Sequence, residues 1–139
     1  MVGVLVLVGT LVLATAAGLV LRARNGRVRV TAGSTLPADV RALVAPAGVT
    51  LVQLSTTFCA PCRHAQVLLS DLAARTDGLH HAELDVTDRP ELARELSILR
   101  TPTTLAISGD GAELLRVGGV PKRDELLAAL TPHLSAHSS

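Results

Sequence analysis

The chain opens on an uninterrupted apolar run. Residues 2–21 (VGVLVLVGTLVLATAAGLVL) include no charge, no proline and no amide side chain. A helix rises about 1.5 Å per residue, so a segment of this length spans roughly 30 Å, the thickness of the hydrocarbon core of a bilayer. We therefore expect residues 1–22 to form a transmembrane anchor, which leaves about 110 residues for one small domain.

The charges beside this run predict its orientation. Four arginines follow it directly and no basic side chain precedes it: Arg22, Arg24, Arg27 and Arg29. Because positive residues next to a span tend to stay in the cytoplasm, we expect a single-pass membrane protein with a cytoplasmic domain, an exported domain being the alternative. Ala14-Thr15-Ala16 resembles a signal-peptide cleavage site, so removal of the segment stays open. Residues 23–34 are expected to be a juxtamembrane basic linker, and membrane lipid is an expected partner of the N-terminal helix.

Composition excludes several function classes. Four of the 13 basic residues belong to that cluster, and the remaining nine are outnumbered by 12 acidic residues, so no basic face for nucleic acid is expected. Phe58 is the only aromatic residue, which removes base-stacking platforms and aromatic carbohydrate sites. The two cysteines, Cys59 and Cys62, are too few for a disulfide-stapled scaffold or a four-thiolate metal site.

Residues 35–139 show the alternating pattern of an α/β domain. The RVRVT segment at 27–31 fits either an edge strand or an extended linker. Periodicity and turn residues predict helices at 37–44, 62–76, 90–99 (with Asp88 as N-cap) and 122–134, central strands at 49–55 and 79–86, and a hairpin formed by 103–108 and 113–117. This order predicts a central mixed β-sheet flanked by helices on both faces.

The two cysteines lie where a buried strand turns into a helix. Unpaired N–H groups and the helix dipole stabilise a thiolate at such a position. Cys59, at the turn, is the expected nucleophile, and Cys62, one helical turn further, is the expected resolving thiol. Pro61 between them suits the first turn of the helix.

Two motifs in this order resemble the thioredoxin superfamily: Phe58-Cys59-Ala60-Pro61-Cys62 and Arg100-Thr101-Pro102-Thr103. The resemblance covers residues 35 to 134 and implies a thioredoxin-like fold. It also implies that Pro102 is a cis-proline facing the disulfide, and that the Thr101 backbone pairs with a bound peptide strand. Phe58, Pro61 and Gly118 would complete the substrate groove.

The sequence departs from the family pattern at three positions. Phe58 replaces a tryptophan and Ala60 a glycine, and both changes are tolerable. Gln53 stands where thioredoxins have a buried aspartate thought to take the proton of the resolving thiol. A neutral amide cannot act as that base, so proton transfer at position 53 is expected to be altered.

The resemblance implies a membrane-tethered protein-disulfide oxidoreductase. Its partners would be protein disulfide or dithiol clients and a reductase or membrane electron donor, with no cofactor. The alternatives are a non-catalytic interaction module of the same fold and a soft-metal chaperone that carries an ion such as Cu(I). A metal site would need Cys59 and Cys62 with His64 and either His80 or His81; we expect no metal, and we expect the latter two histidines to be ordinary side chains on opposite faces of a strand.

Overall fold

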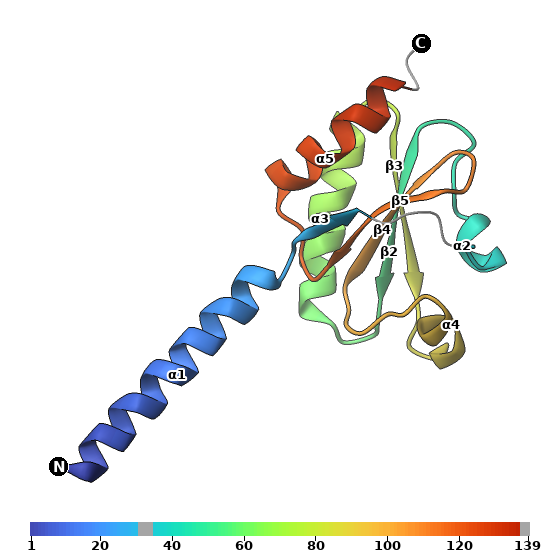
Figure 1. Ribbon diagram of the computed structural model, residues 1–139. Helices are drawn as coiled ribbons and strands as arrows, with labels where there is room; N and C mark the ends of the chain where they lie inside the picture. The colour runs from blue at the N-terminus through green and yellow to red at the C-terminus, as the bar shows by residue number, and fades with distance from the viewer. Residues whose placement is uncertain (31–34, 137–139) are drawn as a thin grey trace.

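The computed structural model describes residues 1–30 and 35–136 (Figure 1). Residues 31–34, inside the expected linker, and 137–139, at the end of the expected domain, lie outside the described residues. The elements follow in the order α1 (Val2–Arg24), β1 (Val28–Val30), α2 (Ala38–Arg41), β2 (Val49–Ser55), α3 (Ala60–Arg75), β3 (Leu79–Asp85), α4 (Pro90–Glu95), β4 (Thr103–Ser108), β5 (Glu113–Gly118) and α5 (Arg123–Ala136).

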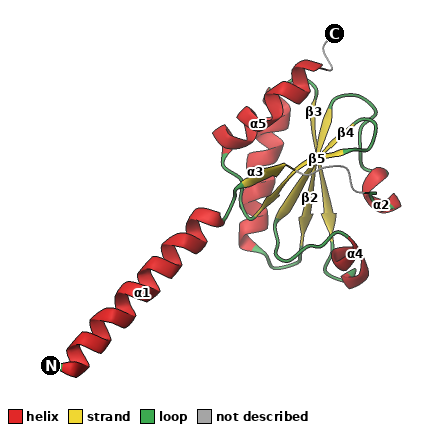
Figure 2. Ribbon diagram, viewed as in Figure 1, coloured by secondary structure: helices red, strands yellow, loops and turns green. Residues whose placement is uncertain are grey.

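The strands of the described residues form one sheet in the order β1-β5-β4-β2-β3. β2 runs parallel to β3, and the other neighbours are antiparallel. Figure 2 shows α3 and α5 on one face of this sheet and α2 and α4 on the other. The predicted mixed sheet with helices on both faces is therefore confirmed.

Strand β2 is at the centre of the core, and all seven of its residues are buried. Val49 and Leu51 pack with α3 and α5, whereas Val52 and Leu54 pack with α2 and α4. This alternation follows from the two-residue period of a strand that is covered on both sides. The same period places Gln53 on the face that carries α3.

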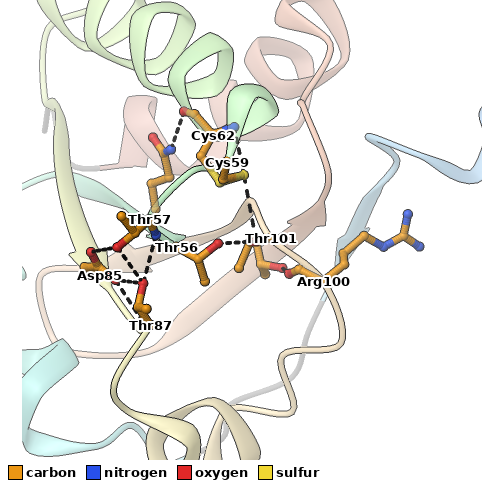
Figure 3. Close-up of a disulfide and its surroundings, with 10 residues drawn as sticks. Thr56, Thr57, Cys59, Cys62, Asp85, Thr87, Arg100 and Thr101 are labelled. Carbon is orange, nitrogen blue, oxygen red and sulfur yellow. Dashed lines mark hydrogen bonds between the residues drawn. A yellow bond between two sulfur atoms is a disulfide. The ribbon is translucent and has the colours of Figure 1, made fainter.

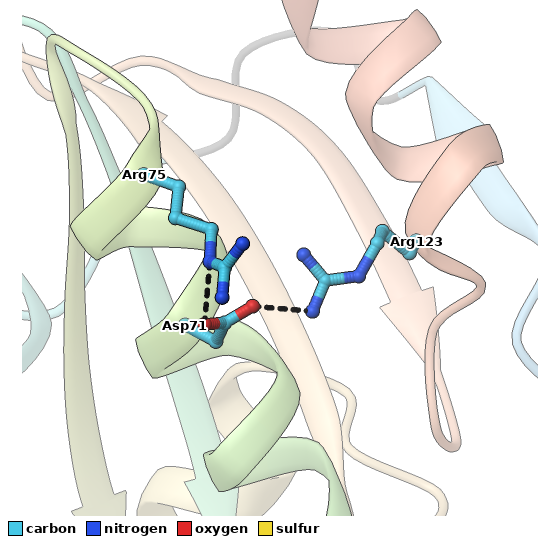
Figure 4. A network of polar contacts seen from close by, with 3 residues as sticks. All are labelled: Asp71, Arg75 and Arg123. Atoms are coloured by element: carbon cyan, nitrogen blue, oxygen red, sulfur yellow. Dashed lines mark hydrogen bonds and ion pairs between the residues drawn. The ribbon is translucent and has the colours of Figure 1, made fainter.

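A polar contact ties the two helices of that face together at their surface (Figure 4). Asp71 of α3 accepts hydrogen bonds from Arg123 Nη2 of α5 at 2.6 Å and from Arg75 Nε at 2.8 Å. These two guanidinium groups, Arg123 first, lower the pKa of Asp71 below its usual value. Because the carboxylate is in contact with solvent, this contact orients α5 more than it stabilises the fold.

Helix α4 begins at Pro90, as predicted, but it has a different N-cap and ends earlier than predicted. Its N-cap is Arg89, without a side-chain cap, so the prediction of Asp88 was wrong. The reason is Pro90, which occupies the first helical position and thereby makes the preceding residue the cap. The helix ends at Glu95 because Ser97 adopts a left-handed backbone angle (φ 55°), and the Ile98 N–H bonds back to Ala93 O at 2.8 Å.

The N-terminal helix α1 extends away from the domain (Figure 1). None of its residues is buried, and by length and composition it is able to cross a membrane. Two parts of the segment expected to be a juxtamembrane basic linker, 23–34, form regular secondary structure. The helix continues to Arg24, and Val28–Val30 pair antiparallel with β5 as an edge strand, which was one of the two readings of RVRVT.

Candidate active site

The two cysteines sit at the start of α3, directly after β2. Cys59 is the N-cap of the helix and Pro61 lies in its first turn. The cysteines form a disulfide with 5.2 Å between their Cα atoms. Cys59 is half-buried, whereas Cys62 is only 5% exposed. An incoming sulfur atom therefore reaches Cys59 first.

Two donors surround the Cys59 sulfur (Figure 3). The Cys62 backbone N–H donates to Cys59 Sγ at 3.2 Å, and the Thr101 hydroxyl donates to the same sulfur at 3.9 Å. Thr101 is also held by a hydroxyl contact of 3.2 Å to Thr56, the residue that follows β2. When the disulfide is reduced, these donors and the N-terminus of α3 favour a thiolate on Cys59 over one on Cys62.

The loop that faces the disulfide carries the second motif. The Thr101–Pro102 peptide bond is cis, as the resemblance implied. Pro102 is buried, and its carbonyl accepts the Gly119 N–H at 2.7 Å. Gly118 pairs with Thr103 across β4 and β5, and a Cβ at Gly118 would lie 3.5 Å from Arg100 Nε. The structure thus brings Thr101 onto the disulfide and places Gly118 on the Arg100 side of the same loop.

Phe58 precedes the disulfide with its ring fully exposed and its backbone in the left-handed region (φ 62°). The neighbouring Thr57 is fixed by a network that sequence reasoning missed (Figure 3). Its N–H donates to Thr87 Oγ1 at 2.8 Å, and Asp85 accepts from the Thr87 hydroxyl at 2.6 Å and from the Thr57 hydroxyl at 3.4 Å. The Thr87 hydroxyl, followed by the Thr87 N–H, holds the pKa of Asp85 below its usual value. The Asp-x-Thr spacing after a strand is the signal that could have found this turn.

Gln53 is completely buried beneath α3, and its amide spans two elements. Its Nε2 donates to the Cys62 carbonyl at 2.8 Å, and its Oε1 accepts from His81 Nε2 at 3.1 Å. The other ring nitrogen of His81 contacts the Ser70 hydroxyl at 3.1 Å. Burial lowers the pKa of His81, and nearby Glu83 opposes that shift. His81, expected to be an ordinary strand histidine, thus supports the amide at position 53, a role that its sequence position did not indicate.

The other histidines considered as ligands are placed elsewhere. His64 is exposed on α3, and the exposed His80 donates to the Ala47 carbonyl at 3.1 Å. Over residues 1–30 and 35–136, no group of three or more His, Cys, Asp or Glu side chains is arranged to hold a metal ion.

Comparison with known proteins gives consistent results for the whole domain. The thioredoxin family model matches residues 32–132. Thioredoxin H2-2 of Oryza sativa subsp. japonica is 33% identical over 94 residues, which cover 68% of this chain and 69% of that protein. A thioredoxin of Staphylococcus saprophyticus is 32% identical over 88 residues, 63% of this chain and 84% of its own length.

Solved structures give the same fold. The X-ray structure of Fasciola hepatica thioredoxin superposes with a TM-score of 0.54 at 28% identity, covering 63% of this chain and 82% of that one. Since the family model spans well over half of the chain and includes both motifs, this chain belongs to the thioredoxin family and is a thiol-disulfide oxidoreductase.

Proposed function

We propose that this oxidoreductase exchanges its Cys-Ala-Pro-Cys dithiol and disulfide with protein clients at a membrane surface. The observation that carries the proposal is the asymmetry of the two sulfurs. Cys59 is half-buried and accepts hydrogen bonds from Cys62 and Thr101, whereas Cys62 lies beneath it. One thiol is thus suited to attack a client and the other to release it.

In the reducing direction, the Cys59 thiolate attacks one sulfur of a client disulfide. The client S–S bond breaks, a mixed disulfide forms, and the displaced client thiolate takes up a proton. The Cys62 thiol then loses its proton and attacks Cys59 Sγ, which releases the second client thiol. Two electrons pass to the client, and the Cys59–Cys62 disulfide forms, the state described above. A reductase or a membrane electron donor would restore the dithiol, and the reverse sequence oxidises a client.

The client-binding groove is built around the disulfide by Phe58, Pro61, Thr101, Pro102 and Gly118. The exposed ring of Phe58 offers apolar contact. The Thr101 hydroxyl contacts Cys59 Sγ, and the backbone of this residue would pair with an extended client segment. Gln53 replaces a proton acceptor with a neutral amide, so release of the client depends on solvent or on the departing thiolate to take the Cys62 proton.

Membrane attachment is the third part of the proposal. Helix α1 is apolar and unburied along its length, and the basic residues of its last turn are Arg22 and Arg24. The arginine asymmetry supports a cytoplasmic domain on a single-pass anchor, with export as the alternative.

The activity is tested with the full chain in a neutral detergent. Insulin disulfides are offered with dithiothreitol as electron source, and precipitation of the reduced chains is followed. We expect the wild-type chain to accelerate precipitation and Cys59→Ser to abolish the acceleration. A wild-type rate no higher than that of dithiothreitol alone would refute the activity and favour a non-catalytic interaction module.

A further inference from the structure

The end of α1 is fixed to the domain beside the proposed client groove. The Gly26 N–H donates to the Gly118 carbonyl at 2.8 Å. A Cβ at Gly26 would lie 2.3 Å from the Val120 carbonyl oxygen, and its φ is +78°, so this contact requires glycine. The chain then enters β1, which pairs with β5. The membrane helix therefore ends at a defined place on the domain.

A pocket of about 350 Å³ lies at this junction, and all the charged residues that line it are positive. Three of its arginines come from the end of α1, from the residue before β1 and from β1 itself, and two come from the segment before β4 and from β5. They are Arg24, Arg27, Arg29, Arg100 and Arg116, and no acidic residue lines the pocket.

Most of this charge has no counter-charge in the described residues. Arg116 is paired, since it donates to Glu113 at 2.8 Å. The Arg100 guanidinium donates to the neutral Asn25 Oδ1 at 3.1 Å. Within residues 1–30 and 35–136, the ion pairs include none of Arg24, Arg27, Arg29 and Arg100.

The strand register brings like charges together in this pocket. Arg29 of β1 lies directly opposite Arg116 of β5. Two like charges at facing positions of an antiparallel pair destabilise it, and Glu113 offsets only one of them. An anion held between the arginines of the two strands would remove this repulsion. The pocket therefore favours a ligand that carries a phosphate or a similar compact negative charge.

We propose that this pocket binds the phosphate headgroup of an anionic phospholipid. Arg24 is the last residue of the apolar helix, so a spanning α1 places the pocket at the level of the headgroups. This inference rests on the membrane attachment proposed above. Since Arg100 directly precedes Thr101 and Gly118 lines the pocket, a bound headgroup lies next to the client groove and holds the disulfide close to the bilayer.

The test uses the full chain in a neutral detergent, with lipid binding followed by native mass spectrometry. The probe is dimyristoyl phosphatidylglycerol, compared with dimyristoyl phosphatidylcholine, inorganic phosphate and a glutamate-rich peptide. The test variant is Arg27→Gln/Arg29→Gln. The matched control, Arg41→Gln/Arg94→Gln, removes the same charge from the exposed surfaces of α2 and α4.

We expect one phosphatidylglycerol to bind in preference to phosphatidylcholine. The test variant should weaken that binding about 25-fold, because each arginine near an anionic surface contributes about fivefold. The control should change it less than twofold. Equal binding of the two lipids, equal loss in both variants, or inorganic phosphate binding as tightly as the lipid would overturn the proposal. Preferential binding of the acidic peptide would make the surface a protein-docking site instead.

Two readouts separate this inference from the function on which it rests. Both double variants should retain wild-type insulin turnover, because neither changes a residue of the disulfide site. Alkaline carbonate extraction of membranes that contain the full chain tests the anchor itself. If carbonate releases the chain, both the membrane anchor and the lipid site are refuted. If the chain resists carbonate and is active but shows no lipid preference, only the proposal of the lipid site is refuted.

Discussion

Replacing Gln53 by leucine should destabilise the domain through two lost hydrogen bonds. The amide is 0% exposed, donates to the Cys62 carbonyl at 2.8 Å and accepts from His81 at 3.1 Å. Leucine is similar in size, so packing changes little. It leaves the buried Cys62 carbonyl without its side-chain donor and the partly buried His81 Nε2–H without an acceptor.

The expected cost follows from these two groups. A buried donor or acceptor that loses its partner costs about 1–3 kcal/mol, and the added apolar burial of leucine offsets part of this. We expect a net loss of about 1–2 kcal/mol in the free energy of unfolding. For a domain of about 100 residues, this lowers Tm by about 5–10 °C.

Far-UV circular dichroism of the oxidised full chain in neutral detergent measures this loss. The chain has no Trp or Tyr for fluorescence, and α1 adds a constant helical signal. Gln66→Leu, the same substitution at an exposed position of α3, is the control and should leave Tm nearly unchanged. A cycle with His81→Phe should show a coupling above about 0.5 kcal/mol. If Gln53→Leu matches the wild type, or if the two changes simply add, the hydrogen-bonded chain through position 53 does not exist.

Three further predictions follow from the same side chains and from α1. Burial lowers the pKa of His81 below 6.5, so the folded state favours the neutral ring. The stability that comes from burying the neutral ring is complete above pH 6.5 and is lost as pH falls through the lower folded-state pKa. His81→Gln should remove this pH dependence of the free energy of unfolding, as measured by urea titrations. Gln53→Asp should accelerate release of mixed disulfides near neutral pH and flatten the rise in rate between about pH 6 and 9 in stopped-flow experiments; superimposable profiles would show that position 53 does not govern proton transfer. A cytosol-only fluorescent reporter fused after Ser139 should be fluorescent and an alkaline phosphatase fusion inactive, and the opposite pair of results would place the domain outside.

The parts of the fold that the sequence predicts are those that local pattern controls. The apolar, β-branched run at 49–55 and the helical spacing after Cys62 identify the central strand and the helix that carries the cysteines. The element order then indicates a mixed sheet. Pro102 was expected to be cis only because of the family resemblance, and the structure has that bond in cis.

The contacts that escaped prediction depend on register between segments far apart in the chain. Gln53 meets His81 because β2 and β3 run parallel, with Gln53 beside Glu83, so that the diagonal histidine reaches the amide. Arg29 faces Arg116 through the pairing of β1 with β5. Local periodicity says which face a side chain takes, but it does not say which residue of another strand lies opposite.

The central claim, that Cys59 attacks clients and Cys62 resolves them, is tested most directly by trapping. The full chain carrying Cys62→Ser or Cys59→Ser is reduced, mixed with oxidised insulin, quenched with acid and separated on a non-reducing gel. We predict that Cys62→Ser accumulates a mixed disulfide, which dithiothreitol reduces, because the partly exposed Cys59 attacks and no second thiol releases the client. Cys59→Ser should accumulate almost none, because Cys62 is 5% exposed. Equal accumulation in the two variants, or accumulation with Cys59→Ser alone, would contradict it.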